Sequence, residues 1–182
     1  MYAESFRHEL FTEPEHYEES HLRDRKAMLP DLWKNEKVAE FVRDVIALAN
    51  TARMFGRPAY LLYGIDDEGH LCGIDSSKHL YDRLRGLTIG EKVQHRLQEV
   101  IPRYIKPTVK WEFKASQING VEVAYLMIHP IATDSPYRVK EQFPSKGEPQ
   151  LRSGQCWIRF GESKSEIQSK EIAPEEDPYR YS

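Results

Sequence analysis

Apolar residues recur at helical spacing in two parts of the chain. Between residues 36 and 51 they return every three or four positions, which predicts an amphipathic helix that Asn35 can cap. The apolar positions of this stretch are Val38, Phe41, Val42, Val45, Leu48 and Ala49. A second helix is predicted to start at Thr88, because Thr88 and Glu91 have the spacing of a capping box. We expect it to end at Pro102, whose ring disfavours continuation of a helix.

Strand patterns lie between and after these helices. Residues 59–65 (AYLLYGI) are apolar at successive positions, which is typical of a central strand buried on both faces. The polar residues 66–69 then predict a tight turn, and residues 70–74 a short returning strand. Farther along, Asn119-Gly120 separates two strand-like stretches, 108–115 and 121–128. Since Asn-Gly is the strongest short hairpin signal, these two strands are expected to pair.

The remaining segments are less regular. Residues 1–30 lack clean periodicity and are expected to be an irregular, partly helical lead-in. Residues 130–154 contain four prolines and are predicted to form a long surface loop. A last strand is predicted over residues 155–160. Ser163 and Glu166 have capping-box spacing, so we expect a short final helix that stops before Pro174.

The order of elements is helix, hairpin, helix, hairpin, strand, helix. This order predicts an α/β (α+β) fold with a mixed, mostly antiparallel sheet and flanking helices. A chain of 182 residues fits one domain. We expect that domain over residues 18–173, between an acidic lead-in (1–17) and an acidic tail (174–182).

The net charge of −3 is unevenly distributed. Residues 1–24 hold seven acidic and two basic side chains, and residues 171–182 hold four acidic and one basic. The stretch between them is left with 23 basic and 18 acidic residues. Such a stretch can present a phosphate-binding face, and it can equally be a solvated surface of mixed charge. Charge alone does not decide the function.

Several classes of protein are disfavoured. Cys72 and Cys156 lie far apart with no metal-binding spacing, which favours a reducing, cytoplasmic location. No apolar run near residue 1 indicates a signal peptide or a membrane span. The motifs GxxxxGK(S/T), GxGxxG, GxSxG and HExxH do not occur. Walker-type nucleotidases, Rossmann dinucleotide sites, serine hydrolases and zinc proteases of those types are therefore not indicated.

Carboxylates are the remaining candidates for chemistry. Glu19 and Asp24 lie five residues apart and are followed by Lys26, and Asp66 directly follows the apolar strand. Carboxylates that converge at a sheet edge would bind Mg²⁺ or Mn²⁺, which activate water for phosphodiester cleavage. On the residues alone, a simpler interpretation is stronger: an ordinary turn at residues 66–69 and solvated carboxylates elsewhere.

Three segments, taken in order, carry a resemblance to a known family. They are Glu19-Ser20 with Asp24-Arg25-Lys26, then Ala47 with Asn50-Thr51, then Gly64-Ile65-Asp66-Asp67-Glu68-Gly69 with Gly73. Weaker matches follow at Asn119-Gly120, Ser135-Pro136-Tyr137 and residues 158–163. Over residues 18–172 the chain resembles Schlafen AlbA-type domains. It departs from them in having Asp24 in place of the usual Glu, Arg25 in place of an apolar residue, and an expanded segment at 52–58.

The resemblance implies a role with nucleic acid. Some family members are metal-dependent ribonucleases that act on structured RNA, such as transfer RNA, through three carboxylates. By position these would be Glu19, Asp24 and Asp66, holding Mg²⁺ or Mn²⁺, with Lys26 as a catalytic residue that neutralises phosphate charge. Other members are described only as DNA-binding or nucleotide-binding domains. An endoribonuclease and a non-catalytic DNA- or RNA-binding or regulatory module both remain open, and nucleotide binding is disfavoured because no phosphate loop is present.

The resemblance also suggests partners. We expect nucleic acid, RNA in preference to DNA, to be held by phosphate contacts from four arginines. These are Arg53, Arg57, Arg138 and Arg159. Larger Schlafen-like proteins carry two such domains that clamp RNA, so a chain with one domain is expected to form a homodimer.

Overall fold

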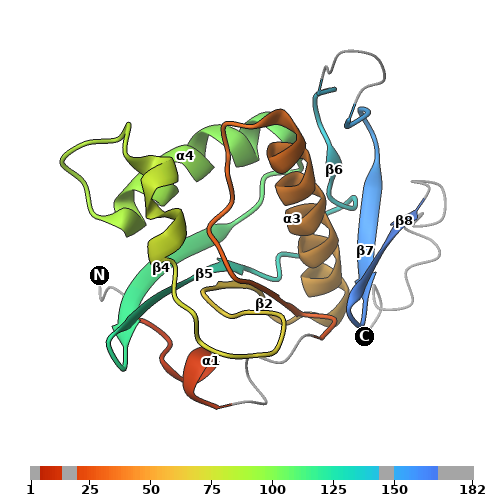
Figure 1. Ribbon diagram of the computed structural model, residues 1–182. Coiled ribbons are helices and arrows are strands. Elements are labelled where there is room, and N and C mark those ends of the chain that lie inside the picture. The colour runs from red at the N-terminus through yellow and green to blue at the C-terminus, as the bar shows by residue number, and fades with distance from the viewer. Residues whose placement is uncertain (1–4, 14–19, 144–149, 168–182) are drawn as a thin grey trace.

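A four-stranded sheet forms the centre of the molecule. The computed structural model describes residues 5–13, 20–143 and 150–167. The strand order is β1 (Arg23–Lys26), β2 (Ala59–Tyr63), β5 (Val121–Ile128) and β4 (Trp111–Ile118). β1 runs parallel to β2, and the other neighbours are antiparallel (Figure 1). The predicted α/β fold with a mixed, mostly antiparallel sheet is confirmed.

Both faces of the sheet are covered, because side chains alternate along each strand. Leu61 and Tyr63 of β2 join a large core with the helices α3 (Asn35–Phe55) and α4 (Ile89–Tyr104). Tyr60 and Leu62 point to the other face, where they pack with the short helix α1 (Glu9–Thr12). All five residues of β2 are buried. The prediction that this apolar run is a central strand is confirmed.

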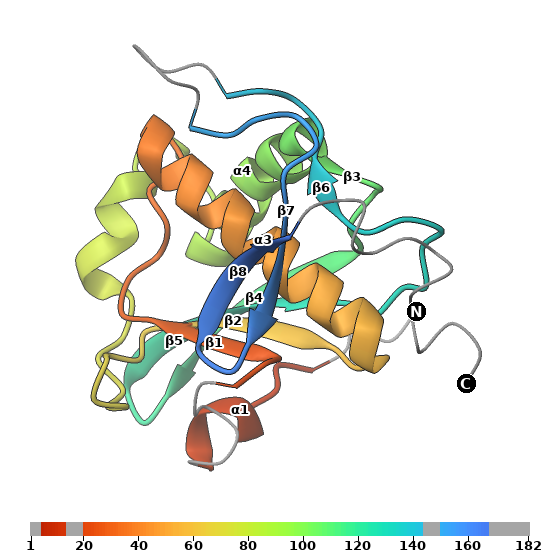
Figure 2. The same ribbon diagram turned by 90° about the vertical axis from the view of Figure 1, so that its right-hand side faces the viewer.

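A second, smaller strand layer packs along α3. β7 (Cys156–Phe160) and β8 (Ser163–Ile167) form an antiparallel hairpin beside the helix, and β3 (Ile105–Lys106) pairs with β6 (Arg138–Val139) (Figure 2). The predicted helix after residue 163 is therefore wrong. Gly161, with φ +58°, and the next residue form a two-residue hairpin turn, so the chain returns as a strand.

Two local predictions are confirmed. Thr88 caps α4 in a complete capping box with Glu91. Asn119 and Gly120 have φ values of +50° and +80°, as a tight hairpin turn between β4 and β5 requires. Both signals depend on neighbouring residues alone, which is why the sequence suffices to locate them.

Other boundaries differ from the predictions. Residues 70–74 form no strand but only one bridge, between Ile65 and Leu71, and a 3₁₀ helix (Asp75–Tyr81) follows. Asn35 is the first residue of α3 and not its cap, and α3 extends to Phe55, where Gly56 ends it with φ +62°. Pro102 lies inside α4, in its last turn.

β1 lies in a segment for which the sequence predicted no strand, because its residues are all charged. Cys72 and Cys156 are both free thiols. No helix among the described residues has the length and apolar character needed to cross a bilayer.

Candidate nucleic-acid interface

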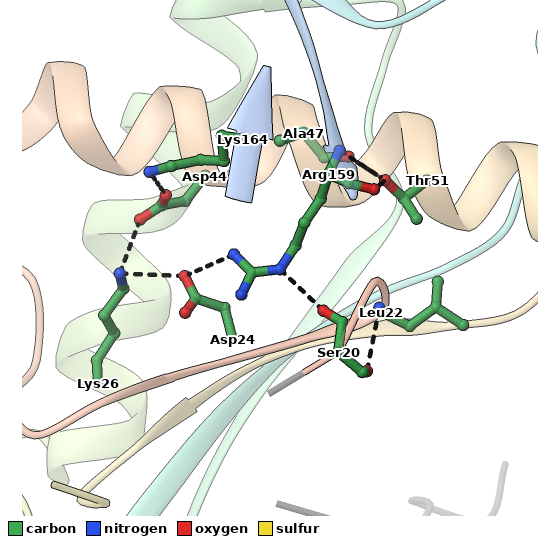
Figure 3. Close-up of polar contacts among 9 residues, drawn as sticks. All are labelled: Ser20, Leu22, Asp24, Lys26, Asp44, Ala47, Thr51, Arg159 and Lys164. Carbon is green, nitrogen blue, oxygen red and sulfur yellow. Dashed lines mark hydrogen bonds and ion pairs between the residues drawn. The ribbon is translucent and has the colours of Figure 1, made fainter. Parts of the chain in front are cut away.

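β1 is the edge strand of the sheet and carries two of the predicted site residues, Asp24 and Lys26. Their side chains lie on the same face of the sheet because they are two positions apart. Asp24 is buried, with 4% of its surface exposed. The Lys26 Nζ lies 3.0 Å from Asp24 Oδ2 and 3.5 Å from the Oδ2 of Asp44, a buried carboxylate of α3 (Figure 3). Lys26 thus joins the edge strand to the helix.

The β7–β8 hairpin contributes two more cations to the same place. The Arg159 Nη1 lies 3.5 Å from Asp24 Oδ2, and its Nε donates to the Ser20 carbonyl oxygen at 2.9 Å. Lys164 donates to Asp44 Oδ1 (Figure 3). Five residues from four elements therefore meet, and we call them the charged cluster. They are Asp24, Lys26, Asp44, Arg159 and Lys164.

The charged cluster is layered by sign. The carboxylate side chains of Asp24 and Asp44 are only 5% and 8% exposed, whereas those of Lys26 and Lys164 are 39% and 33% exposed. Burial acts to lower the pKa of Lys26, but the charges of Asp44 and then Asp24 outweigh it, so the pKa is raised. The ammonium group therefore stays charged at neutral pH. The carboxylates and the Arg159 guanidinium are buried, while the two lysine ammonium groups reach solvent, where they can meet a phosphate.

Two α3 residues hold the strands of this region in place. The Asn50 side chain donates to the carbonyl oxygens of Tyr137 and Trp157, both at 2.9 Å, and accepts from the Tyr137 N–H at 2.7 Å. Thr51 Oγ1 accepts from the Arg159 N–H at 3.1 Å. Asn50 and Thr51 thereby fix the backbone from which Arg159 reaches Asp24.

A hollow of about 470 Å³ opens beside the charged cluster. Lys26 and Asp44 lie on its wall together with the apolar side chains of Met28 and Phe41 and the ring of Tyr63. Burial raises the pKa of Tyr63 well above its ordinary value, and the nearby carboxylates add to this effect, so its hydroxyl stays protonated. The exposed Lys26 of the cluster thus borders a surface hollow that is lined by both charged and apolar side chains.

Asp66 lies at the predicted turn after β2, but its carboxylate is used locally. Asp66 Oδ1 accepts from the backbone N–H groups of His70 at 2.8 Å and Glu68 at 3.0 Å. The hydrogen bond from His70 is the main cause that lowers the pKa of Asp66. Asp24 pairs in register with Leu61, five residues before Asp66 along the chain. Asp24 therefore lies beside the middle of β2, whereas Asp66 lies beyond its end.

The predicted metal ligands do not form a complete set here. Glu19 lies outside the described residues. Among the residues that the structure does describe, no three His, Cys, Asp or Glu side chains are grouped to hold an ion. Because Asp24 is paired with cations and Asp66 with backbone N–H groups, the described carboxylates do not fit a metal site as they lie. The Mg²⁺ or Mn²⁺ site stays a prediction.

The four predicted arginines lie in different surroundings. Arg57 is exposed, while Arg53 is half-buried and donates through Nε to the Thr133 carbonyl oxygen at 3.2 Å. Arg138 is half-buried on β6, and Arg159 is buried in the charged cluster with 2% exposure. Arg159 is therefore not at the surface itself; it pairs with Asp24, which in turn pairs with the exposed Lys26.

Sequence reasoning missed Asp44 and Lys164. The signal for Asp44 was available, since a single carboxylate lies among the apolar positions of the α3 pattern and a buried charge needs a partner. No comparable signal exists for Lys164. It lies on an exposed strand, and only the packing of the β7–β8 hairpin against α3 brings it to Asp44.

The chain is similar to solved structures and to a protein family. Among solved structures, the DIP2311 protein from Corynebacterium diphtheriae matches over 81% of this chain with 16% identity and a TM-score of 0.42. The chain spans 22% of that protein's length. No protein with a curated description matches. The family model for Schlafen, AlbA_2 matches residues 19–168 and so includes β1, α3 and the β7–β8 hairpin. This chain belongs to the Schlafen AlbA_2 family.

Proposed function

We propose that this domain binds nucleic acid, RNA in preference to DNA, with Lys26 and Lys164 in contact with backbone phosphates. The observation that carries the proposal is the layering of the charged cluster, in which both ammonium groups reach solvent above buried carboxylates. Phosphate contacts from lysine and arginine supply most of the affinity of such proteins, largely without regard to sequence. Membership of the Schlafen AlbA_2 family supports a nucleic-acid partner. The preference for RNA follows from the resemblance to ribonucleases of structured RNA.

The proposal predicts the effect of removing the two exposed cations. Lys26→Gln and Lys164→Gln should each weaken binding to an RNA hairpin, and each should make the salt dependence of log K shallower by about one unit. Fluorescence anisotropy over a series of salt concentrations measures both quantities. The DNA hairpin of the same sequence, titrated in parallel, tests the preference for RNA.

A matched control separates a local contact from general electrostatics. Arg103 lies in the last turn of α4, with a side chain that is 61% exposed. Arg103→Gln removes the same charge and should leave affinity and salt slope nearly unchanged. Circular dichroism should show that all three variants remain folded. If the two lysine variants behave like Arg103→Gln, the charged cluster is not the binding face.

A second candidate function is a metal-dependent endoribonuclease. The observation that favours it is that Glu19, Asp24 and Asp66 are all retained at the positions of the family's three carboxylates. The non-catalytic module is the alternative. In it, the same carboxylates serve only the ion pairs and the turn that are described above.

Asp66→Asn distinguishes the two functions. The change removes one charge with almost no change in volume, and the Asn Oδ1 can still accept from His70 and Glu68, so the turn should persist. A nuclease should lose cleavage by orders of magnitude and its stabilisation by Mn²⁺, while RNA affinity falls little. The measurements are RNA cleavage with Mn²⁺ or EDTA, and thermal unfolding of both proteins with and without Mn²⁺. A wild type that cleaves nothing and gains no stability from Mn²⁺ would exclude the nuclease and leave the binding module.

A further inference from the structure

A second hollow, of about 530 Å³, lies at the beginning of β1. It is formed by three segments far apart in the sequence: the region of α1, residues 20–23, and the connection from α3 to β2. We call it the basic–aromatic hollow and define it by six residues. These are Arg7, His21, Arg23, Phe55, Arg57 and Tyr60. Its volume lies in the range of about 300–1,000 Å³ that is usual for ligand sites.

The charges around the hollow favour an anion. Among the residues that the structure describes, three arginines and one carboxylate, Glu9, line it. Arg57 is exposed, and the Arg23 Nε donates to Ser20 Oγ at 3.3 Å, which orients that guanidinium beside the hollow. Guanidinium groups match the geometry of phosphate oxygens, because they offer several N–H donors in one plane. A phosphate group can therefore be held by arginines from separate segments.

The aromatic residues of the hollow form a platform. Phe55, the last residue of α3, is 44% exposed, which is unusual for a large apolar ring. It stacks on His21 with ring centroids 5.7 Å apart and an angle of 15° between the planes. The His21 Nδ1 accepts a hydrogen bond from the Gly161 N–H, so the turn of the β7–β8 hairpin fixes this ring. Two parallel rings, one anchored to backbone, suit the stacking of a flat ligand.

From these observations we infer that the basic–aromatic hollow is a subsite for one nucleotide of single-stranded RNA. The phosphate binds the arginines and the base stacks on the Phe55–His21 platform. A base can reach such a platform only when it is unpaired, so the occupant is a single strand or a loop and not a continuous duplex. The inference rests on the proposed function and adds the kind of RNA that the domain selects.

The location of the hollow relative to the charged cluster agrees with this inference. Arg23 lines the hollow and Lys26 belongs to the cluster. They are three residues apart on β1, roughly 10 Å along the strand, so their side chains point to opposite faces of the sheet. Ser20 lines the hollow, and its carbonyl oxygen accepts a hydrogen bond from the Arg159 guanidinium of the cluster. One RNA strand that crosses the edge of the sheet at β1 would contact both.

The test uses a short single-stranded RNA that contains 2-aminopurine, whose fluorescence is quenched when the base stacks. With the full-length protein, Phe55→Ala should abolish the quench and weaken single-strand affinity about ten-fold. Arg57→Gln should weaken affinity several-fold and make the salt dependence shallower. Affinity for a blunt RNA duplex should change less than two-fold in both variants. Phe55→Leu keeps the apolar surface without the aromatic ring, so it should behave like Phe55→Ala.

The control variants match the test variants in the exposure and the type of the side chain that is removed. Leu87→Ala removes another exposed apolar side chain (43% exposed), and Arg85→Gln removes another exposed arginine, both in the loop before α4. Neither should change single-strand binding. Normal binding and quenching by Phe55→Ala and Arg57→Gln would overturn the subsite while leaving the proposed function intact. Full quenching by Phe55→Leu would overturn the stacking. A wild type that binds no RNA would overturn both the proposed function and the subsite.

Discussion

At the scale of single residues, Asp24 is the point on which the charged cluster depends. It is buried, and it lies 3.0 Å from the Lys26 ammonium and 3.5 Å from the Arg159 guanidinium. Burying charges costs free energy that their mutual attraction only partly returns, so such a group need not increase stability over an apolar core. Removal of one member is different, because the remaining charges lose their partner while still buried. Arg159 is only 2% exposed, so water cannot readily solvate its guanidinium group.

Asp24→Asn should therefore be strongly destabilising. Lys26 can still pair with Asp44, but the buried Arg159 guanidinium would lose its ion pair with Asp24. We expect the free energy of unfolding to fall by about 3 kcal/mol, which is typical of breaking a buried ion pair. Urea unfolding at neutral pH measures the change. The control is Asp75→Asn, whose carboxylate is 75% exposed and pairs with Lys78, and whose loss should cost less than about 1 kcal/mol. Equal effects of the two substitutions would contradict the role given to Asp24.

Cys156 predicts a dependence of stability on alkaline pH. Burial raises the pKa of its thiol from an ordinary 9.0 to about 11, although hydrogen bonding by Asn50 acts to lower it. Between pH 9 and pH 11 the unfolded chain therefore loses this proton while the folded protein keeps it. The resulting stabilisation is fully present below pH 9 and disappears as the pH rises towards 11.

A Cys156→Ala variant isolates this contribution, because the tyrosines with raised pKa values are common to both proteins. Wild-type stability should fall more steeply than that of the variant between pH 9 and pH 11, as followed by urea unfolding at several pH values. Parallel curves for the two proteins would show that the buried thiol does not contribute.

Sequence patterns predicted a structural feature correctly where that feature depends only on residues nearby in the chain. Thr88 with Glu91 and Asn119 with Gly120 need only their neighbours in the chain, and both were located correctly. The partners of Asp24 were not predictable in this way. Lys26 is two residues away, but Arg159 is brought close only by folding.

At the scale of elements, β1 shows why polar edge strands escape prediction. Strand patterns are recognised by apolar residues on at least one face. β1 reads Arg-Asp-Arg-Lys, and its inward positions are satisfied by ion pairs with α3 and the β7–β8 hairpin instead of by apolar packing. Its outward residue Arg25 donates to the Asp67 carbonyl oxygen at 2.8 Å. The strand thus depends on partners that no local pattern contains.

β8 shows a local signal overridden by packing. Ser163 and Glu166 have the spacing of a helix cap, yet the segment pairs in register with β7, and Gln155 donates to the Glu166 carboxylate at 3.1 Å. The positive φ of Gly161 starts the tight turn that imposes this pairing. One consequence concerns the charged cluster, because a strand, and not a helix, carries Lys164 to Asp44.

At the scale of the whole molecule, the order of elements and the motif positions were enough to predict the fold class and the family. The geometry of the site was not predictable to the same extent. The charged cluster draws on four elements, and the basic–aromatic hollow on three separate segments. The sequence singled out Asp24, Lys26 and Arg159 of the charged cluster and Arg57 of the hollow. It did not single out Asp44 and Lys164, or the aromatic residues of the hollow, which come from distant parts of the chain.

The last prediction concerns assembly. β4 is the other edge of the four-stranded sheet and, among the described residues, pairs only with β5. An eight-residue edge strand offers a row of backbone N–H and C=O groups to a second copy, and two-fold pairing of equal subunits is the commonest assembly. We expect a homodimer, in which the two charged clusters, on β1, would lie at the two outer edges of the joined sheet. Light scattering at micromolar concentration should give twice the chain mass of 21.3 kDa. A mass of one chain that does not change with concentration would contradict the dimer and leave each domain to bind RNA alone.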